Sequence, residues 1–243
     1  MATAENVAHT TLEDYVRMVE AGVFEGRRVE LIDGVAYEMP PQLSPHAATV
    51  MLAQEILRAV FSPGFSLRCQ MPLGVGAESM PEPDLAVVPG KPGDYWAAHP
   101  TGAALVLEVT DTSLHYDRKK GRVYAKAGLQ DYWIINLTRN VLEVYRHPVG
   151  ASYRTRLVLS RGEQIAPLAR PDALIAVANL LPVRSIDTSA PKRREAAEEH
   201  RPLSLVLCAN AQARPQTVRR NLAPLTKRAD RFMGGSMYLT LRK

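Results

Sequence analysis

The stretch "ALVLEVT", residues 104–110, places one carboxylate, Glu108, inside an otherwise apolar run. The run predicts a β-strand in which Glu108 shares a face with Ala104 and Val106 near the carboxyl end. An ionised carboxylate is costly there unless it is paired, hydrogen-bonded, bound to a metal or protonated. Position alone leaves these alternatives open, and a salt bridge to a covering helix explains Glu108 as well as a functional role does.

The segments around this strand predict a mixed sheet with helices packed against it. Asp33-Gly34, between two alternating runs, is a strong signal for a two-residue β-hairpin. Ser44 is expected to cap a long amphipathic helix, with Pro45 at its first position. Because helices and strands follow each other in mixed order, the fold class is α/β or α+β. Helices are expected at 10–22, 44–62 and 116–128, and strands at 27–32, 35–39, 66–75, 84–89, 104–110, 132–137, 141–147 and 154–160.

The composition is that of an ordinary globular chain of 243 residues, long enough for one large domain or two small ones. No apolar run approaches the roughly 18 residues that a membrane span needs. The first residues lack the basic and apolar regions of a secretory signal, and the two cysteines lack metal-binding or disulfide spacing. We therefore expect a cytoplasmic protein that does not engage a membrane.

The positive charge is concentrated in the C-terminal part of the chain. Residues 188–243 contain twelve Lys and Arg but four Asp and Glu, a net charge of +8, whereas residues 1–187 carry −3. The same part scatters Pro and Arg without a hydrophobic period, which predicts a basic, mostly disordered extension after a domain at 10–187. The overall basicity is weak evidence for a nucleic-acid-binding core, because a solvated tail explains it equally well.

Two acids and a lysine could meet at one rim of the predicted sheet. Asp84 opens the strand at 84–89, and Glu108 lies near the end of its own strand. If these strands are neighbours, a divalent cation between the carboxylates would relieve their repulsion and support phosphodiester hydrolysis. From the next helix, Lys119 or Lys120 could orient water or stabilise a developing negative charge. Taken singly, each residue has a simpler explanation as a turn residue, an ion-pair partner or a solvated lysine.

Several motifs follow one another in the order found in one nuclease family. They are "RVELIDGVAYEMP", "SPHA", "PEPDLAVV", "LEVTDTSLHYDR", "KGRVYAKAGLQDYWIINL" and "VLEVYRHP". Over roughly residues 10–183 the chain resembles the Uma-type putative restriction endonuclease family, a branch of the PD-(D/E)XK nuclease superfamily. The resemblance implies a restriction-endonuclease-like fold, which is a mixed central β-sheet flanked by helices with a Mg²⁺ site at one rim.

The resemblance also implies roles for particular acidic residues. Asp84 in "EPD" is similar to the first acid of the superfamily signature, and Glu108 in "LEV" to the second. Glu30 in "VELIDG" matches an upstream acid of the family that can add a metal contact. His46 in "SPH" matches a further recurrent position, although a histidine near a helix start is more often a packing or capping residue.

The catalytic lysine is displaced in this resemblance. Thr110 stands where the superfamily usually has its lysine, two residues after the second acid. In the family the lysine lies on the following helix, four residues before a tyrosine, which here gives Lys120 before Tyr124. The spacing from Asp117 is one residue shorter than in the family, so Lys119 competes for the same role.

These observations favour a Mg²⁺-dependent endonuclease that hydrolyses phosphodiester bonds in DNA, with Mn²⁺ as an alternative metal. A competing hypothesis is a non-catalytic module that binds a nucleic acid or a protein on the same scaffold. A third is a mobile-element or toxin-like component whose C-terminal extension governs its choice of partner. A homodimer, the target sequence and the choice between DNA and RNA are left open.

Overall fold

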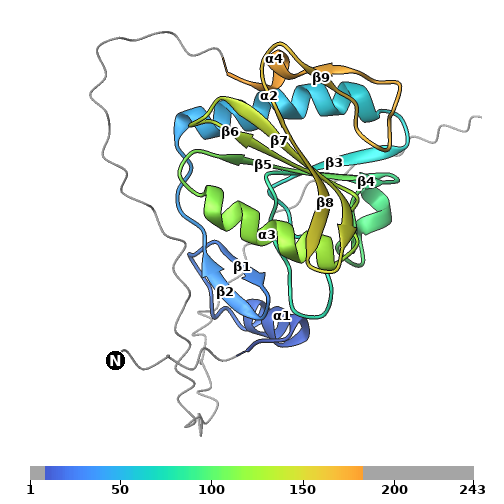
Figure 1. Cartoon of the computed structure of the whole chain (residues 1–243). Coiled ribbons are helices and arrows are strands. Elements are labelled where there is room, and N and C mark those ends of the chain that lie inside the picture. Colours follow the sequence, from blue (N-terminus) through green and yellow to red (C-terminus); the bar gives the residue numbers. More distant parts are fainter. Residues whose placement is uncertain (1–8, 183–243) are drawn as a thin grey trace, which may run out of the picture. The chain divides into compact units, whose positions relative to one another are not determined.

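The computed structural model describes residues 9–182, and the extension predicted at 188–243 lies outside the described residues. The fold is α+β, built on a mixed sheet in the spatial order β3-β4-β5-β6-β7-β8 (Figure 1). Among these strands β5 and β6 run parallel, and every other neighbouring pair is antiparallel. The strands are Phe65–Cys69, Leu85–Pro89, Leu105–Thr110, Asp131–Asn136, Val141–Val149 and Ser152–Leu159. The expected mixed central sheet flanked by helices is confirmed.

Helices, a hairpin and short elements complete the described chain. They are α1 (Leu12–Glu20), β1 (Val29–Ile32), β2 (Val35–Glu38), α2 (Ser44–Phe61), η1 (Pro92–Tyr95), α3 (Leu114–Lys126), β9 (Gln164–Ile165), β10 (Ile175–Ala176) and α4 (Val177–Leu180). One face of the sheet packs against α2 and α4, and the other against α3 (Figure 1). No helix within residues 9–182 is long and apolar enough to span a bilayer.

The alternation of β5 orients Glu108 toward α3. Val106 packs in the apolar cluster beneath α3, and the Glu108 carboxylate contacts α3 side chains. Leu105 and Leu107, on the other face of the strand, pack against α2. Because β5 and β6 are parallel, the chain needs a crossover between them, and α3 is that crossover. Ala104 precedes β5 and packs on the α2 side, so its expected face is wrong, since strict alternation holds only inside the strand.

The β1–β2 hairpin forms as expected and stands on the α3 side of the sheet (Figure 1). Asp33 and Gly34 both have positive φ, as a tight two-residue turn requires. The hairpin makes a sheet of its own, and a bridge between Leu31 and Met80 attaches it to the segment before β4. This attachment places β1 beside the start of β4.

Most predicted bounds differ from the structure by one or two residues, and two further differences concern the cap of α2 and the length of β3. α2 begins at Ser44, so Leu43 is the N-cap and Ser44 does not cap, although Pro45 does lie in the first turn. The strand expected at 66–75 ends at Cys69, because Gln70 turns the chain with a positive φ. Neither difference moves an element away from its predicted place in the fold.

Gly121 on α3 lies against the ring of Tyr132 in β6, where an added Cβ would come within 2.9 Å of Cε1. The ring is buried, and its hydroxyl donates to the backbone oxygen of Asp117 at 2.7 Å. We predict that Gly121→Ala lowers the free energy of unfolding by about 1–3 kcal/mol, despite the better helix propensity of alanine.

Urea denaturation followed by circular dichroism checks this prediction. Gly93→Ala is the matched control, because no atom lies within 4 Å of its added Cβ, and it should unfold like the wild type. Equal stability of the two variants would contradict the close packing of α3 on β6.

Candidate functional site

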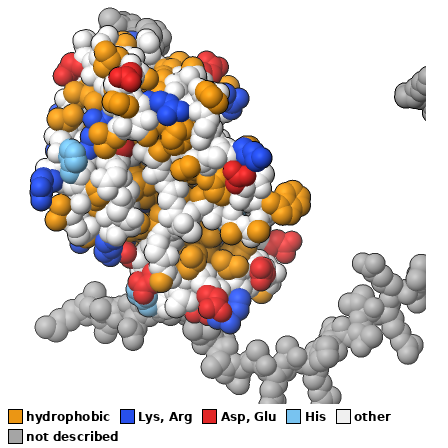
Figure 2. Space-filling model, turned by 90° about the vertical axis from the view of Figure 1, so that its right-hand side faces the viewer, with side chains coloured by type: hydrophobic (Ala, Val, Ile, Leu, Met, Phe, Trp, Pro, Cys, Tyr) orange, Lys and Arg blue, Asp and Glu red, His pale blue; other side chains and the backbone are white. Residues whose placement is uncertain are grey.

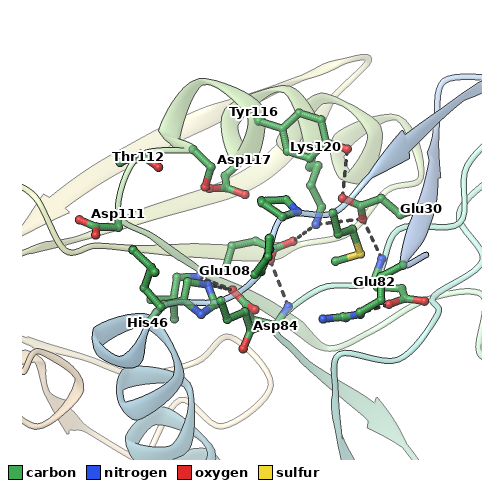
Figure 3. A pocket seen from close by; sticks show the side chains of 18 residues that line it. Glu30, His46, Glu82, Asp84, Glu108, Asp111, Thr112, Tyr116, Asp117 and Lys120 are labelled. Carbon is green, nitrogen blue, oxygen red and sulfur yellow. Dashed lines mark hydrogen bonds and ion pairs between the residues drawn. The ribbon is translucent and has the colours of Figure 1, made fainter. Parts of the chain in front are cut away.

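A pocket opens where the end of β5, the start of β4 and the first turns of α2 and α3 meet (Figure 3). The loops at 39–43 and 111–113 form two of its walls. Carboxylates gather in it, and Figure 3 shows them around Lys120 and His46. The buried acids that line it are Glu30, Asp84, Glu108 and Asp117.

Lys120 joins the acids of β1 and β5. Its Nζ lies 2.7 Å from Glu108 Oε1 and 3.2 Å from Glu30 Oε2, and all three side chains are at most 4% exposed. The Tyr124 hydroxyl donates to the same Glu108 oxygen at 3.1 Å. Lys120 and Tyr124 reach one carboxylate because residues four apart share a face of a helix.

Lys119 does not line the pocket. Its Nζ donates to the Tyr37 hydroxyl at 2.6 Å and lies 4.6 Å from the centre of the same ring. The two adjacent lysines therefore have different environments, one among buried carboxylates and the other against the β1–β2 hairpin. Of the two competing candidates, the geometry brings Lys120 to the acids.

Asp84 and Glu108 are tied to each other across neighbouring strands. The backbone N–H of Asp84 donates to Glu108 Oε2 at 3.0 Å, and the backbone N–H of Val109 donates to Asp84 Oδ2 at 2.8 Å. Gln70 donates to the other Asp84 oxygen at 3.2 Å. Because β4 pairs with β5, the two carboxylates meet at one rim.

His46 lies in the first turn of α2 and reaches the same rim. Its Nε2 is 3.2 Å from Asp84 Oδ2, while its Nδ1 is buried without a hydrogen-bond partner. Burial alone would lower the pKa of the imidazole, but the hydrogen bond and charge of Asp84 raise it. The side chain thus belongs to the acid cluster and does not merely cap the helix.

Asp117 is a pocket residue that sequence reasoning missed. It lies on α3, one turn before Lys120, and its Oδ2 accepts a hydrogen bond from Ser113 at 2.9 Å. Burial raises the pKa of its carboxyl group to about 6. The available signal was its spacing of three residues from Lys120, which places both on one face of a helix.

The pocket holds more negative than positive groups. Burial, reinforced by Asp84 and Asp117, raises the pKa of Glu108 to about 8 although Lys120 opposes the shift. Burial would lower the pKa of Lys120, but the neighbouring carboxylates hold it well above its ordinary value. Burial alone would raise the pKa of Asp84, but the hydrogen bond from His46 outweighs it and lowers that pKa. Six acidic side chains line the pocket with one arginine, one lysine and one histidine, and this excess of acids makes the pocket attractive to a cation.

The oxygen donors of the pocket suit a small divalent cation. In residues 9–182 no three acidic, histidine or cysteine side chains already surround a common metal position. Mg²⁺, however, is usually held by one or two carboxylates, with waters and substrate phosphates completing its shell. Asp84 and Glu108, on adjacent strands, supply a carboxylate pair of that kind.

The fold is shared with a protein of known structure. The structure is similar to the crystal structure of "a putative nuclease belonging to DUF820" from Anabaena variabilis, with a TM-score of 0.57 and 15% identity. That similarity covers 70% of this chain and 96% of the other. The family model Uma2, described as "Putative restriction endonuclease", matches residues 12–178, and the chain belongs to this family. No curated protein gives a significant match. The family resemblance of the motifs is confirmed.

Lys119 and Lys120 form a matched pair for testing the buried ion cluster. We predict that Lys120→Met lowers the free energy of unfolding by about 3–5 kcal/mol, because it leaves Glu108 and Glu30 buried without their cation. Lys119→Met removes one cation–π contact and one hydrogen bond at a partly exposed position and should cost about 1 kcal/mol.

Urea denaturation of the two variants measures the difference. Adding Glu108→Gln to Lys120→Met should recover part of the loss, because it removes one of the unpaired carboxylates. Similar losses from Lys119→Met and Lys120→Met would contradict the assignment of Lys120 as the cation of the cluster.

Proposed function

We propose that this pocket hydrolyses phosphodiester bonds in DNA with the help of a bound divalent cation, Mg²⁺ or alternatively Mn²⁺. The observation that carries the proposal is the pairing of Asp84 and Glu108 on adjacent strands, with Lys120 Nζ 2.7 Å from Glu108. Membership of a family described as a restriction endonuclease supports the same reaction class.

In this proposal Asp84 and Glu108 hold the cation, and Glu30 supports the site through Lys120. A divalent cation supplies charge stabilisation at the phosphoryl oxygen and lowers the pKa of a bound water. The water oxygen bonds to phosphorus and gives a proton to solvent. The bond to the leaving oxygen breaks, and the leaving oxygen takes a proton from solvent to become a hydroxyl group. The chain's own contribution is to fix the acids and the lysine around the reacting phosphate.

Lys120 is suited to position the attacking water. Its ion pairs with Glu108 and Glu30 hold the ammonium beside the acids. An ammonium has three N–H donors, which can bind a water molecule or a phosphoryl oxygen, where negative charge develops in the transition state. Since both carboxylates hold the same nitrogen, the ammonium is oriented before substrate binds.

The acids themselves are oriented by neighbouring donors. Tyr124 and Lys120 hold one oxygen of Glu108, and the backbone N–H of Asp84 holds the other. The backbone N–H of Val109 fixes Asp84 in turn. Preorganised ligands of this kind lower the reorganisation cost of the reaction.

Substitution of the paired acids tests the activity. Asp84→Asn and Glu108→Gln should each reduce cleavage of plasmid and of labelled single-stranded DNA at least a hundredfold in Mg²⁺ or Mn²⁺, because each removes a metal ligand. Glu55→Gln, an exposed acid on α2, should cleave like the wild type. Cleavage that survives EDTA, or that Asp84→Asn leaves intact, would overturn the proposal.

Metal binding is measurable without any cleavage. Millimolar Mg²⁺ or Mn²⁺ should raise the melting temperature of the wild type, because a ligand that binds the folded state stabilises it. The rise should be lost in Asp84→Asn and Glu108→Gln and kept in Glu55→Gln, which isothermal titration calorimetry can confirm. Absence of metal binding dependent on the two acids would instead favour the non-catalytic module.

A further inference from the structure

A second hollow adjoins the candidate site. It lies between α1, the turn after α1, and the loops that carry Pro72 and His99, and we refer to it as the α1 hollow. Arg28 and Glu82 line both the α1 hollow and the pocket of the acids. The two hollows therefore adjoin each other at the Arg28–Glu82 ion pair.

Arg28 is the accessible cation at this junction. Among the described residues the pocket has three cationic side chains, of which Lys120 is enclosed by carboxylates and His46 contacts Asp84. The Arg28 guanidinium pairs with Glu82 at 3.1 Å, yet its side chain is 46% exposed. Guanidinium groups bind phosphate through paired N–H donors, and an exposed ion pair is exchanged at little cost.

The walls of the α1 hollow suit a base. Val16, Val19 and Met80 line it, and Val19 is among the exposed large apolar residues of the described chain. A nucleobase is planar and largely apolar on its face, and such faces bind apolar or aromatic surfaces without regard to sequence. A base in the α1 hollow would contact its apolar side chains, while the phosphate of the same nucleotide would contact the Arg28 guanidinium.

The depth of the acids favours an unpaired strand. Asp84 is 8% and Glu108 is 3% exposed, behind the loops at 39–43 and 111–113. Figure 2 draws the face on the opposite side of the molecule from the pocket, and acidic and basic side chains are interspersed on it. A single strand can extend one phosphate into a narrow pocket, whereas a duplex presents its phosphates on a wide cylinder.

We propose that the substrate is single-stranded DNA, with the nucleotide next to the scissile phosphate in the α1 hollow and Arg28 on the adjoining phosphate. This inference rests on the proposed function, since it takes the acid pocket as the place of the scissile bond. Arg28 is then a substrate-binding residue, and Glu82 holds its guanidinium at the junction until the phosphate replaces the carboxylate.

Fluorescence anisotropy with the full chain and a labelled 12-mer of single-stranded DNA tests the inference, using Ca²⁺ in place of Mg²⁺. Arg28→Gln should weaken binding about tenfold, as the loss of a charge-assisted hydrogen bond implies. It should also reduce the slope of log affinity against log salt by about 0.7, the value for one phosphate contact on a single strand. A duplex of the same length should bind more weakly than the single strand.

Two further variants separate phosphate binding from a structural role. Glu82→Gln removes the same ion pair but keeps the guanidinium, so it should bind the 12-mer at least as tightly as the wild type. Arg58→Gln removes an exposed arginine of α2 that lines neither hollow and should leave affinity unchanged within twofold. An abasic 12-mer should lose affinity for the wild type without a change in salt slope.

The inference is overturned if Arg28→Gln binds the 12-mer as tightly as Arg58→Gln does, or if Arg28→Gln and Glu82→Gln weaken binding equally. It is also overturned if the duplex or the abasic strand binds the wild type as well as the 12-mer does. These outcomes are distinct from failure of the proposed function. That failure appears as absent cleavage by the wild type in Mg²⁺ or Mn²⁺, whatever the binding of the single strand.

Discussion

The contact between Lys120 and Glu108 is the interaction on which the rest of the site depends. The buried carboxylate of Glu108 on β5 is compensated by the buried cation Lys120. The second carboxylate, Glu30, helps to offset the cost of removing that cation from water. The hairpin that carries Glu30 is thus held against α3 by charge as well as by packing. Apolar residues in place of this cluster would give a similar free energy of unfolding, so the presence of buried charges points to function.

The three parts of the fold contribute different properties to the site. The sheet supplies two acids on adjacent strands, whose separation is fixed by the backbone hydrogen bonds between them. α3 supplies Lys120, and the hairpin closes one side of the pocket. Because sites on strands and helices are held more precisely than sites on loops, the acids and the lysine need little rearrangement when a substrate arrives. The loops at 39–43 and 111–113 form two further walls of the pocket.

Local patterns in the sequence were sufficient for much of the fold but not for every site residue. The hairpin at Asp33-Gly34 and the alternation of β5 follow from turn chemistry and strand periodicity, which act over a few residues. To choose between Lys119 and Lys120, one must know which face of α3 each lysine occupies. A shift of the helix start by one residue would exchange the two positions. Asp117 was missed because an acid in a first helical turn is ordinarily explained by the helix dipole. The role proposed for Arg28 has no local signal in the sequence, because it depends on two hollows that both have Arg28 in their lining only in the folded chain.

The parallel pairing of β5 and β6 also affects the chain entropy that assembling the site costs. The crossover through α3 brings Tyr124 to Glu108 over a sequence separation of only 16 residues, whereas the contact between Tyr116 and Glu30 closes a separation of 86. Closing a short loop costs less chain entropy than closing a long one. The contacts within the strand–helix unit that carries the acid and the lysine therefore cost less chain entropy than the contact that attaches the hairpin. The buried cation thus has one carboxylate partner close in sequence and one that only the complete fold brings to it.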